Sequence, residues 1–329
     1  MRRKSRNANF LDEGAFETMN CQLSVIIPTY NRAASVCNAL ESVFAQTIKP
    51  EEIVVVDDGS TDDTQRVVQR FCSDVRYIKQ PNRGPGAARN TGLNAAHGRF
   101  LAFLDSDDQW KPTKVEEQLA LMARERVVVC FTDAIMNRDG PWGGRIDSWN
   151  AYVMSQALNE QPMETGVIHG PMRILALAAH LLLTPTLIVD RALVMSTGGF
   201  DERLLTNQDI DLYLRLALKV EFAYLAKPLT LCSSGPCRAM EVPSSRASGT
   251  VRGIERVYKD RIAAYRKAIV LAKQKGRDME ARWAEVGYAR SLRGLAGLFR
   301  RRKRWISALR LYATYFVIIG RWPAAEVQR

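Results

Sequence analysis

The chain has 329 residues, 47% of them hydrophobic, with 47 Lys and Arg against 35 Asp and Glu. That length and apolar content can bury a sizeable core, which excludes a wholly disordered chain and favours one large α/β domain with an appendage. The six cysteines form no CxxC pair and the three histidines lie far apart, so neither a disulfide framework nor a zinc site is expected.

The net charge of +12 is concentrated near the C-terminal end. Residues 252–329 hold 20 Lys and Arg and 6 Asp and Glu, a net of +14, whereas the other residues hold 27 and 29, a net of −2. A basic segment of this kind favours an anionic surface, such as lipid headgroups. No recognisable nucleic-acid-binding module accompanies the charge, so nucleic acid is not an expected partner.

In chain order, residues 1–20 contain several cations but no apolar core, which predicts a disordered lead-in rather than a secretory signal. Apolar runs and helical spacing then alternate along the chain. Such alternation predicts a parallel sheet with right-handed crossovers. The predicted strands are residues 23–27, 53–56, 75–78, 100–104, 127–132 and 186–189. The predicted helices are residues 33–46, 61–71, 112–124 and 207–216.

Polar and charged clusters follow three of these strands, at residues 28–32, 57–63 and 105–108. Ligands of parallel sheets bind beyond the carboxyl ends of the strands, so the convergence of the three clusters predicts a site there. The turn after the first strand reads Pro-Thr-Tyr-Asn, without the GxGxxG fingerprint of a dinucleotide-binding domain.

The acidic cluster at residues 105–108 is typical of a metal site. In an extended segment Asp105 and Asp107 point to the same side, where two like charges repel unless a cation lies between them. Mg²⁺ or Mn²⁺ prefers such oxygen ligands and usually brings phosphates. The alternative is that Asp108 caps a helix with Pro112 in its first turn.

The second half of the domain is less regular. Residues 174–189 are apolar but interrupted by His180 and Pro185, and they fall short of the ~18 residues of a membrane span. They predict a buried helix leading into a strand. Asp209 lies near the start of the helix at 207–216, so a first-turn acid stabilised by the helix dipole is one interpretation of it.

Six segments, occurring in this order, resemble the family 2 glycosyltransferases, which have the A-type nucleotide-diphospho-sugar transferase fold. They are SVIIPTYNR at 24–32, IVVVDDGSTD at 53–62, ARNTG at 88–92, FLDSDD at 103–108, GGFDE at 198–202 and DIDL at 209–212. The resemblance implies an α/β fold, with a mostly parallel Rossmann-like sheet flanked by helices and a helical C-terminal appendage. It implies a glycosyltransferase catalytic domain over residues 21–250 and a basic helical tail over residues 251–329.

The resemblance also implies which residues bind the nucleotide. Tyr30 would stack on the base and Asp58 would accept a hydrogen bond from a base N–H, a pairing that suits uracil. Pro28 and Arg89 would also contact the nucleotide, although Arg89 is otherwise read as an exposed helix arginine. Asp105 would reach the ribose or the metal.

The catalytic roles come from the same resemblance. Asp107, with Asp105, would hold Mn²⁺ or Mg²⁺, which neutralises the departing diphosphate. Asp209 would be the general base that takes the proton from the acceptor hydroxyl as the anomeric configuration inverts. The family usually has Glu-Asp at this point, whereas this chain has Gln208 before Asp209.

These roles predict an inverting, metal-dependent glycosyltransferase. It would move a sugar from a nucleotide-diphospho-sugar, favoured as UDP-linked, to a saccharide or lipid-linked hydroxyl acceptor in cell-surface polysaccharide or glycolipid synthesis. The alternative, motivated by Gln208, is a non-catalytic nucleotide-sugar-binding regulator or partner.

The tail predicts helices over residues 251–275 and 278–302, and then a basic cluster at 300–304. Apolar residues at positions 305, 309, 312, 316 and 319 follow with amphipathic spacing. This combination predicts contact with an anionic membrane, and hence a cytoplasmic protein peripheral on its inner face. The alternative is a helical hairpin packed on the catalytic domain with a solvated basic face.

Overall fold

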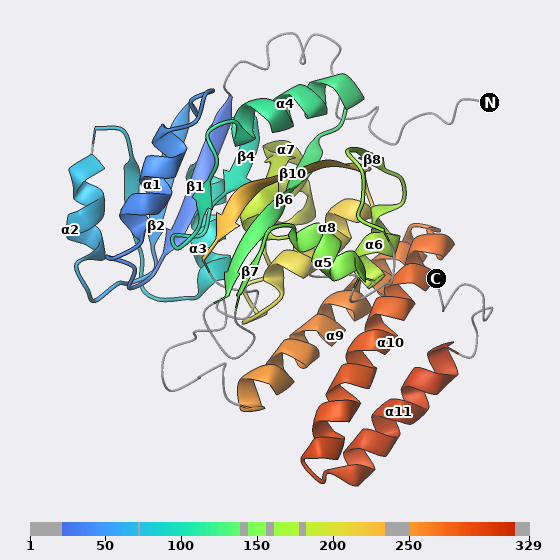
Figure 1. Cartoon of the computed structure of the whole chain (residues 1–329). Helices are drawn as coiled ribbons and strands as arrows, with labels where there is room; N and C mark the ends of the chain where they lie inside the picture. The colour runs from blue at the N-terminus through green and yellow to red at the C-terminus, as the bar shows by residue number, and fades with distance from the viewer. Residues whose placement is uncertain are drawn as a thin grey trace.

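The computed structural model describes residues 22–71, 73–138, 144–155, 161–177, 182–233 and 251–319 (Figure 1). The lead-in expected at residues 1–20 lies outside the described residues. So do parts of two segments predicted above, at 178–181 and 320–329.

A single sheet organises the first 233 residues, and its described strands run in the order β3-β2-β1-β4-β9-β6-β10-β5. Strand β7 pairs with β6, and β8 pairs with β10. The strands are β1 (Leu23–Thr29), β2 (Glu52–Asp57), β3 (Arg76–Lys79), β4 (Phe100–Phe103), β5 (Gln109–Trp110), β6 (Val129–Arg138), β7 (Gly144–Ile146), β8 (Gly166–Ile168), β9 (Leu187–Asp190) and β10 (Phe222–Cys232).

The α/β class with a Rossmann-like parallel half is confirmed, but the sheet as a whole is mixed. Strands β3, β2, β1 and β4 are mutually parallel, whereas β9 runs antiparallel to both of its neighbours, β4 and β6. The chain leaves β6 at the carboxyl edge of the sheet and re-enters through β9 from that same edge, so β9 has to run in the opposite direction. A strand's apolar run does not encode its direction, which is why the strand–helix alternation could not identify β9 as the reversed strand.

Helices cover both faces of the sheet (Figure 1). Successive strand residues point to opposite faces, so Val25 enters one core and Ile26 the other. The core that contains Val25 packs under α1 and α4, and the core that contains Ile26 packs under α8. The helices are α1 (Val36–Phe44), α2 (Thr64–Val68), α3 (Pro85–Ala95), α4 (Lys114–Glu125), α5 (Trp149–Val153), α6 (Pro171–Leu177), α7 (Arg191–Thr197), α8 (Gln208–Ala217), α9 (Val251–Gln274), α10 (Asp278–Arg301) and α11 (Trp305–Ile319).

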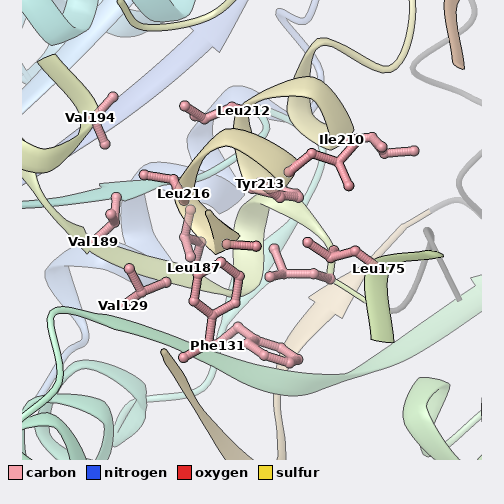
Figure 2. Close-up of a cluster of buried hydrophobic side chains, with 14 of the residues drawn as sticks. Val129, Phe131, Leu175, Leu187, Val189, Val194, Ile210, Leu212, Tyr213 and Leu216 are labelled. Carbon is pink, nitrogen blue, oxygen red and sulfur yellow. The ribbon is translucent and has the colours of Figure 1, made fainter. Parts of the chain in front are cut away.

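Figure 2 shows the core beneath α8. Val129 and Phe131 of β6 and Val189 of β9 lie against the apolar face of α8, which includes Ile210 and Leu216. All five side chains are buried. Burying a side chain of this size contributes about 1.5–3 kcal/mol, so this face anchors α8, and with it Asp209, to the middle of the sheet.

Helices α9 and α10 pack on the sheet domain rather than trailing from it. Tyr265 of α9 lies directly over Gly287 of α10, where an added Cβ would come within 2.3 Å of its ring. The Tyr265 hydroxyl donates a 2.5 Å hydrogen bond to the Leu175 carbonyl of α6. One side chain therefore joins α9, α10 and α6, and the absent Cβ of Gly287 is what permits the close approach.

Lys114, in the first turn of α4, is fully buried. Its Nζ lies 4.2 Å from the centroid of the Trp110 ring and donates a 2.6 Å hydrogen bond to Gln118 Oε1. Burial lowers the pKa of Lys114 from 10.5 to about 7. A neutral amine is therefore much easier to bury here than an ammonium ion.

We expect Lys114 to make stability depend on pH. Above about pH 7 the unfolded chain keeps a proton on Lys114 that the folded chain has released, so unfolding takes up a proton and stability rises with pH. From about pH 7 to about pH 9 this group should add about 2 kcal/mol to the free energy of unfolding, and Lys114→Met should remove that gain. Urea unfolding across this range measures it; identical pH dependence in the two proteins would show that Lys114 stays charged.

Candidate active site

The loops that follow β1 and β2 are hydrogen-bonded to each other. Asn31, which has a left-handed φ of 51°, donates its N–H to Ser60 Oγ at 2.9 Å and accepts the Thr61 N–H on Oδ1 at 2.8 Å. The next residue, Arg32, donates its N–H to Thr64 Oγ1 at 2.9 Å. Because β1 and β2 are parallel neighbours, their carboxyl ends meet at one edge, and these bonds join the two loops into a unit.

Asp58 lies in this unit and organises the turn before α3. Its two oxygens accept hydrogen bonds from Gln80 Nε2, the Arg83 N–H and the Gly84 N–H, at 2.7–2.9 Å. Burial raises the pKa of the Asp58 carboxyl, and the three donors partly offset that rise. Gly84 has a φ of 91°, a conformation that favours glycine, so the sequence signal for this turn was Gly84 itself.

The structure distinguishes Tyr30 from Pro28, which were both expected to contact the nucleotide. Tyr30 follows the last residue of β1 and is half-buried at the edge of the sheet. Pro28 lies within β1, opposite Val56, and is buried. Strand β1 runs two residues further than the pattern predicted. Pro28 is therefore inside the strand, and Tyr30 is the more accessible of the two to a nucleotide.

Arg89 of α3 is buried, so its interpretation as an exposed helix arginine is wrong. Its Nη2 donates to Asp105 Oδ1 at 2.7 Å, and its guanidinium lies 5.6 Å from the centroid of the Phe200 ring. Burial lowers the pKa of Arg89, but Asp105 and Asp209 more than offset this, so the guanidinium stays charged. Arg89 Nε is buried with no hydrogen-bond partner among the described atoms.

The Arg89 helix and the loop before α8 are held together by Asn90. Its side chain donates to the Phe200 carbonyl at 2.9 Å and accepts the Phe200 N–H at 2.8 Å. An added Cβ on the neighbouring Gly199 would come within 2.7 Å of Asn90 Oδ1. Two segments about 110 residues apart thus meet through Gly199 and the Asn90 amide. The neighbouring Arg89 packs on Phe200 at the same contact.

Asp209 lies in the first turn of α8, close enough to Arg89 for their charges to attract. It is partly buried, with Thr184 Oγ1 3.5 Å from its Oδ2. Burial raises the pKa of the Asp209 carboxyl above its usual value, against the opposing pull of Arg89. A raised pKa makes a carboxylate a stronger base once it ionises.

Thr184 was not singled out by the sequence, and the reversed strand explains its position. It begins the short turn Thr184–Thr186 that leads into β9, and because β9 is antiparallel its start lies at the carboxyl edge of the neighbouring strands. There Thr184 Oγ1 also accepts a 3.0 Å hydrogen bond from the Tyr213 hydroxyl. The network Tyr213–Thr184–Asp209 therefore depends on the topology and not on any local motif.

Helix α9 holds the residue two positions before Asp209. Asn207 has a left-handed φ of 56°, with its side chain donating to the Val257 carbonyl at 3.1 Å and accepting from Arg261 Nε at 3.2 Å. Asp260 Oδ2 accepts both the N–H and the hydroxyl of Thr206, at 3.0 and 3.1 Å. A left-handed asparagine is uncommon and needs such surroundings to persist.

The carboxylates after β4 differ in what they can bind. Asp107 is partly exposed, with Arg32 Nη2 3.7 Å from its Oδ2, and Asp105 has one oxygen on Arg89. Asp108 is buried and accepts the Ser233 N–H at 3.0 Å. Burial, with Asp105 and Asp107 nearby, raises the pKa of Asp108 well above its usual range. Helix α4 begins at Lys114 after Thr113, so Asp108 does not cap it.

The carboxylates after β4 fit a divalent cation that takes its remaining ligands from a substrate. Among the described residues no three His, Cys, Asp or Glu side chains are arranged to hold a metal ion. Mg²⁺ is commonly held by one or two carboxylates plus substrate phosphates rather than by a cage of protein ligands. Asp107 and the second oxygen of Asp105 match that kind of site.

Gln208 is the first residue of α8 and is buried. Its Nε2 donates to the Leu205 carbonyl at 3.3 Å, and its Cγ would lie 3.3 Å from a Cβ added to Gly86 in α3. A neutral amide can be buried at this contact with one hydrogen bond, whereas a carboxylate would need a cationic partner. Gln208 thus packs α8 against α3 without adding a charge.

The sequence profile described as "Glycosyl transferase family 2" matches residues 24–180. The chain is 38% identical over 120 residues to the Escherichia coli "UDP-Glc:alpha-D-GlcNAc-diphosphoundecaprenol beta-1,3-glucosyltransferase WfaP", covering 36% of this chain and 47% of that protein. Its fold is similar to that of Staphylococcus aureus TarS 1–349 in complex with UDP-GlcNAc, with a TM-score of 0.62 at 22% identity over 89% of this chain and 81% of the other.

A mannosyltransferase from Pyrobaculum calidifontis, solved with GDP-Man and Mn²⁺, has a TM-score of 0.55 at 19% identity, covering 94% of this chain and 85% of the other. The chain spans only about a quarter to a third of the length of the first curated relatives that it matches. The ordered motifs and the shared fold agree with the profile match, so residues 24–180, just under half of the chain, resemble a glycosyl transferase family 2 domain.

Proposed function

We propose that this chain is an inverting glycosyltransferase that moves a sugar from a UDP-linked donor to an acceptor hydroxyl, with Mn²⁺ or Mg²⁺ as cofactor. The observation that carries the proposal is the environment of Arg89, which is buried, hydrogen-bonded to Asp105 and close enough to Asp209 for their charges to attract. Perturbed, partly buried groups of this kind are typical of catalytic sites.

The donor would lie along the carboxyl edge of β1, β2 and β4. The half-buried ring of Tyr30 would stack on the base, and Asp58, whose oxygens retain lone pairs, would accept a hydrogen bond from the base. Arg89 Nε, a buried donor with no partner among the described atoms, would meet an oxygen of the bound nucleotide-sugar. The proposal depends on Tyr30 and not on the buried Pro28.

Asp209 would accept the proton of the acceptor hydroxyl as that oxygen attacks the anomeric carbon. Attack opposite the leaving group inverts the configuration in one displacement. The Thr184 hydroxyl, 3.5 Å from Asp209 Oδ2 and bonded to Tyr213, would orient the carboxylate. A divalent cation held by Asp107 and Asp105 would supply Lewis-acid stabilisation of the diphosphate.

The names of similar proteins support the choice of donor and acceptor. TarS was solved with UDP and with UDP-GlcNAc, and the name of WfaP specifies a UDP-glucose donor and a diphosphoundecaprenol-linked acceptor. We therefore propose a saccharide or lipid-linked acceptor in cell-surface polysaccharide or glycolipid synthesis. Residues 21–250 would form the catalytic domain, with residues 251–329 as a helical region that α9 ties to the active site.

A nucleotide screen tests the donor assignment. In the presence of Mn²⁺, UDP and UDP-sugars should raise the melting temperature of the full chain more than GDP-, ADP- or CMP-linked sugars do, because ligands stabilise the folded state that binds them. UDP release from the stabilising UDP-sugar should then be measurable by a coupled assay. A larger shift with GDP-mannose would overturn the choice of uracil.

Gln208 favours a second candidate, a non-catalytic protein that binds nucleotide-sugar as a regulator or partner. Its neutral side chain stands where the family usually has a charged glutamate, next to the aspartate proposed as general base. Donor binding without release or transfer of the sugar, across a broad panel of acceptors, would establish this candidate. Transfer that disappears in Asp209→Asn would exclude it.

A further inference from the structure

Helix α11 has an apolar face that no described part of the chain covers. Trp305, Ile306, Leu309, Phe316 and Val317 are each between 56% and 71% exposed. At 100° per residue they fall within about 120° of one another around the helix axis, so they form one continuous face. An exposed apolar patch on this scale is typical of an interaction surface.

The opposite side of α11 accounts for its attachment. Ala308, the one buried residue of the described helix α11, joins Leu295, Leu298 and Phe299 of α10 in a small core, with Tyr312 packed against it. Figure 1 shows α10 lying between α9 and α11. Tyr312 therefore belongs to the inner side, and the outward face is rotated toward Ile306 and Val317 relative to the face that the spacing at 305, 309, 312, 316 and 319 predicted.

The charge around this face has one sign. Residues 286–319 contain eight Arg and Lys and no Asp or Glu. Arg300, Arg301 and Lys303 are exposed just before the helix, and Arg310 is exposed at the border of the apolar face. Two copies meeting through this face would bring these like charges together, whereas an anionic surface would neutralise them.

We propose that α11 lies in the interface of an anionic membrane, with its apolar face among the lipid chains and its flanking cations at the headgroups. None of the described helices is long and apolar enough to cross a bilayer, so the contact is in the plane of the surface. Aromatic residues are enriched at this depth, which suits Trp305 and Phe316. Long Arg side chains keep their charge in water while their stems cover apolar surface.

Vesicle sedimentation of the full chain tests the proposal. The protein should pellet with phosphatidylcholine vesicles that contain phosphatidylglycerol and stay in solution with phosphatidylcholine alone, and added salt should release it. The triple variant Trp305→Ser, Leu309→Ser, Phe316→Ser should partition at least about tenfold more weakly. Arg301→Gln with Arg310→Gln should weaken binding and flatten its salt dependence.

Matched controls come from the other two helices. Val270 in α9 and Met279 in α10 are 50% and 60% exposed, so Val270→Ser with Met279→Ser removes apolar surface of similar exposure elsewhere. This control should bind as the wild type does, and circular dichroism should show all variants folded. Equal binding to both kinds of vesicle, no binding to either, or unchanged binding of the triple variant would overturn the proposal. So would a wild-type dimer that the triple variant dissociates without any vesicle binding, since α11 would then be an interface between copies.

Discussion

Replacing Asp209 with Asn is expected to lower kcat for sugar transfer by about 10²- to 10⁴-fold, the usual contribution of a positioned general base. The substitution keeps the shape of the side chain but removes its ability to take a proton. Donor binding should change little, because the nucleotide contacts proposed for Tyr30 and Asp58 lie at the ends of β1 and β2. Steady-state kinetics with the donor identified by the nucleotide screen would separate kcat from KM.

The pH profile of kcat/KM gives a second readout of Asp209. Burial raises the pKa of this carboxyl, and a base acts only when ionised, so the rate should rise with pH as Asp209 loses its proton. Asp209→Asn should lose that rise as well as the rate. A merely structural aspartate would show neither effect.

Asp278 provides the control for the interpretation of Asp209 as a first-turn acid. It is exposed in the first turn of α10, so Asp278→Asn should cost only the helix-dipole contribution of about 0.3–1 kcal/mol and leave transfer unchanged. If Asp209→Asn behaves in the same way, with a small loss of stability and full activity, Asp209 is not the base.

Asp107→Asn is expected to lower kcat/KM by roughly 10²- to 10³-fold, because stabilisation of the diphosphate by a metal amounts to several kcal/mol and each 1.36 kcal/mol is a factor of ten. An amide oxygen is a weaker ligand than a carboxylate and carries no charge. Titration with Mn²⁺ should show a higher metal requirement in the variant. Electron paramagnetic resonance of unbound Mn²⁺, with UDP present, measures metal binding independently of turnover.

Asp62 provides the control for charge removal near this edge. Its carboxylate accepts hydrogen bonds from Thr64 and from the Ala33 N–H, and it has no proposed contact with metal. Asp62→Asn should therefore leave the Mn²⁺ titration unchanged. Full activity and unaltered Mn²⁺ binding in Asp107→Asn would remove the metal role from this residue.

Much of the site could be predicted from sequence because the relevant signals are local. A buried strand followed by acids, as at residues 100–108, indicates both an element and the edge where it ends. The motif order placed Tyr30, Asp58, Arg89 and Asp209 in one family pattern. In the structure Arg89 forms an ion pair with Asp105, and its charge also interacts with that of Asp209. The separate functions of these residues remain proposals.

Other features depend on contacts between distant segments, which no local pattern carries. The buried state of Arg89 could not be predicted, because its helix turn resembles any exposed turn until Phe200 and Asp105 pack around it. The reversal of β9, which brings Thr184 to Asp209, is set by the edge at which the chain re-enters the sheet. The basic tail was read as an appendage, yet Asp260 and Arg261 hold the residues that precede Asp209.

The sequence by itself determined the order of the glycosyltransferase motifs, the strand–helix alternation and the acids at the strand ends, since each is encoded in short runs whose periodicity and order can be read directly. Only the tertiary structure decided which of those acids are buried, which strand runs backwards and which face of α11 stays uncovered. Burial and direction result from packing between segments up to 125 residues apart, and the free energy of that packing is a property of the assembled chain rather than of any one stretch.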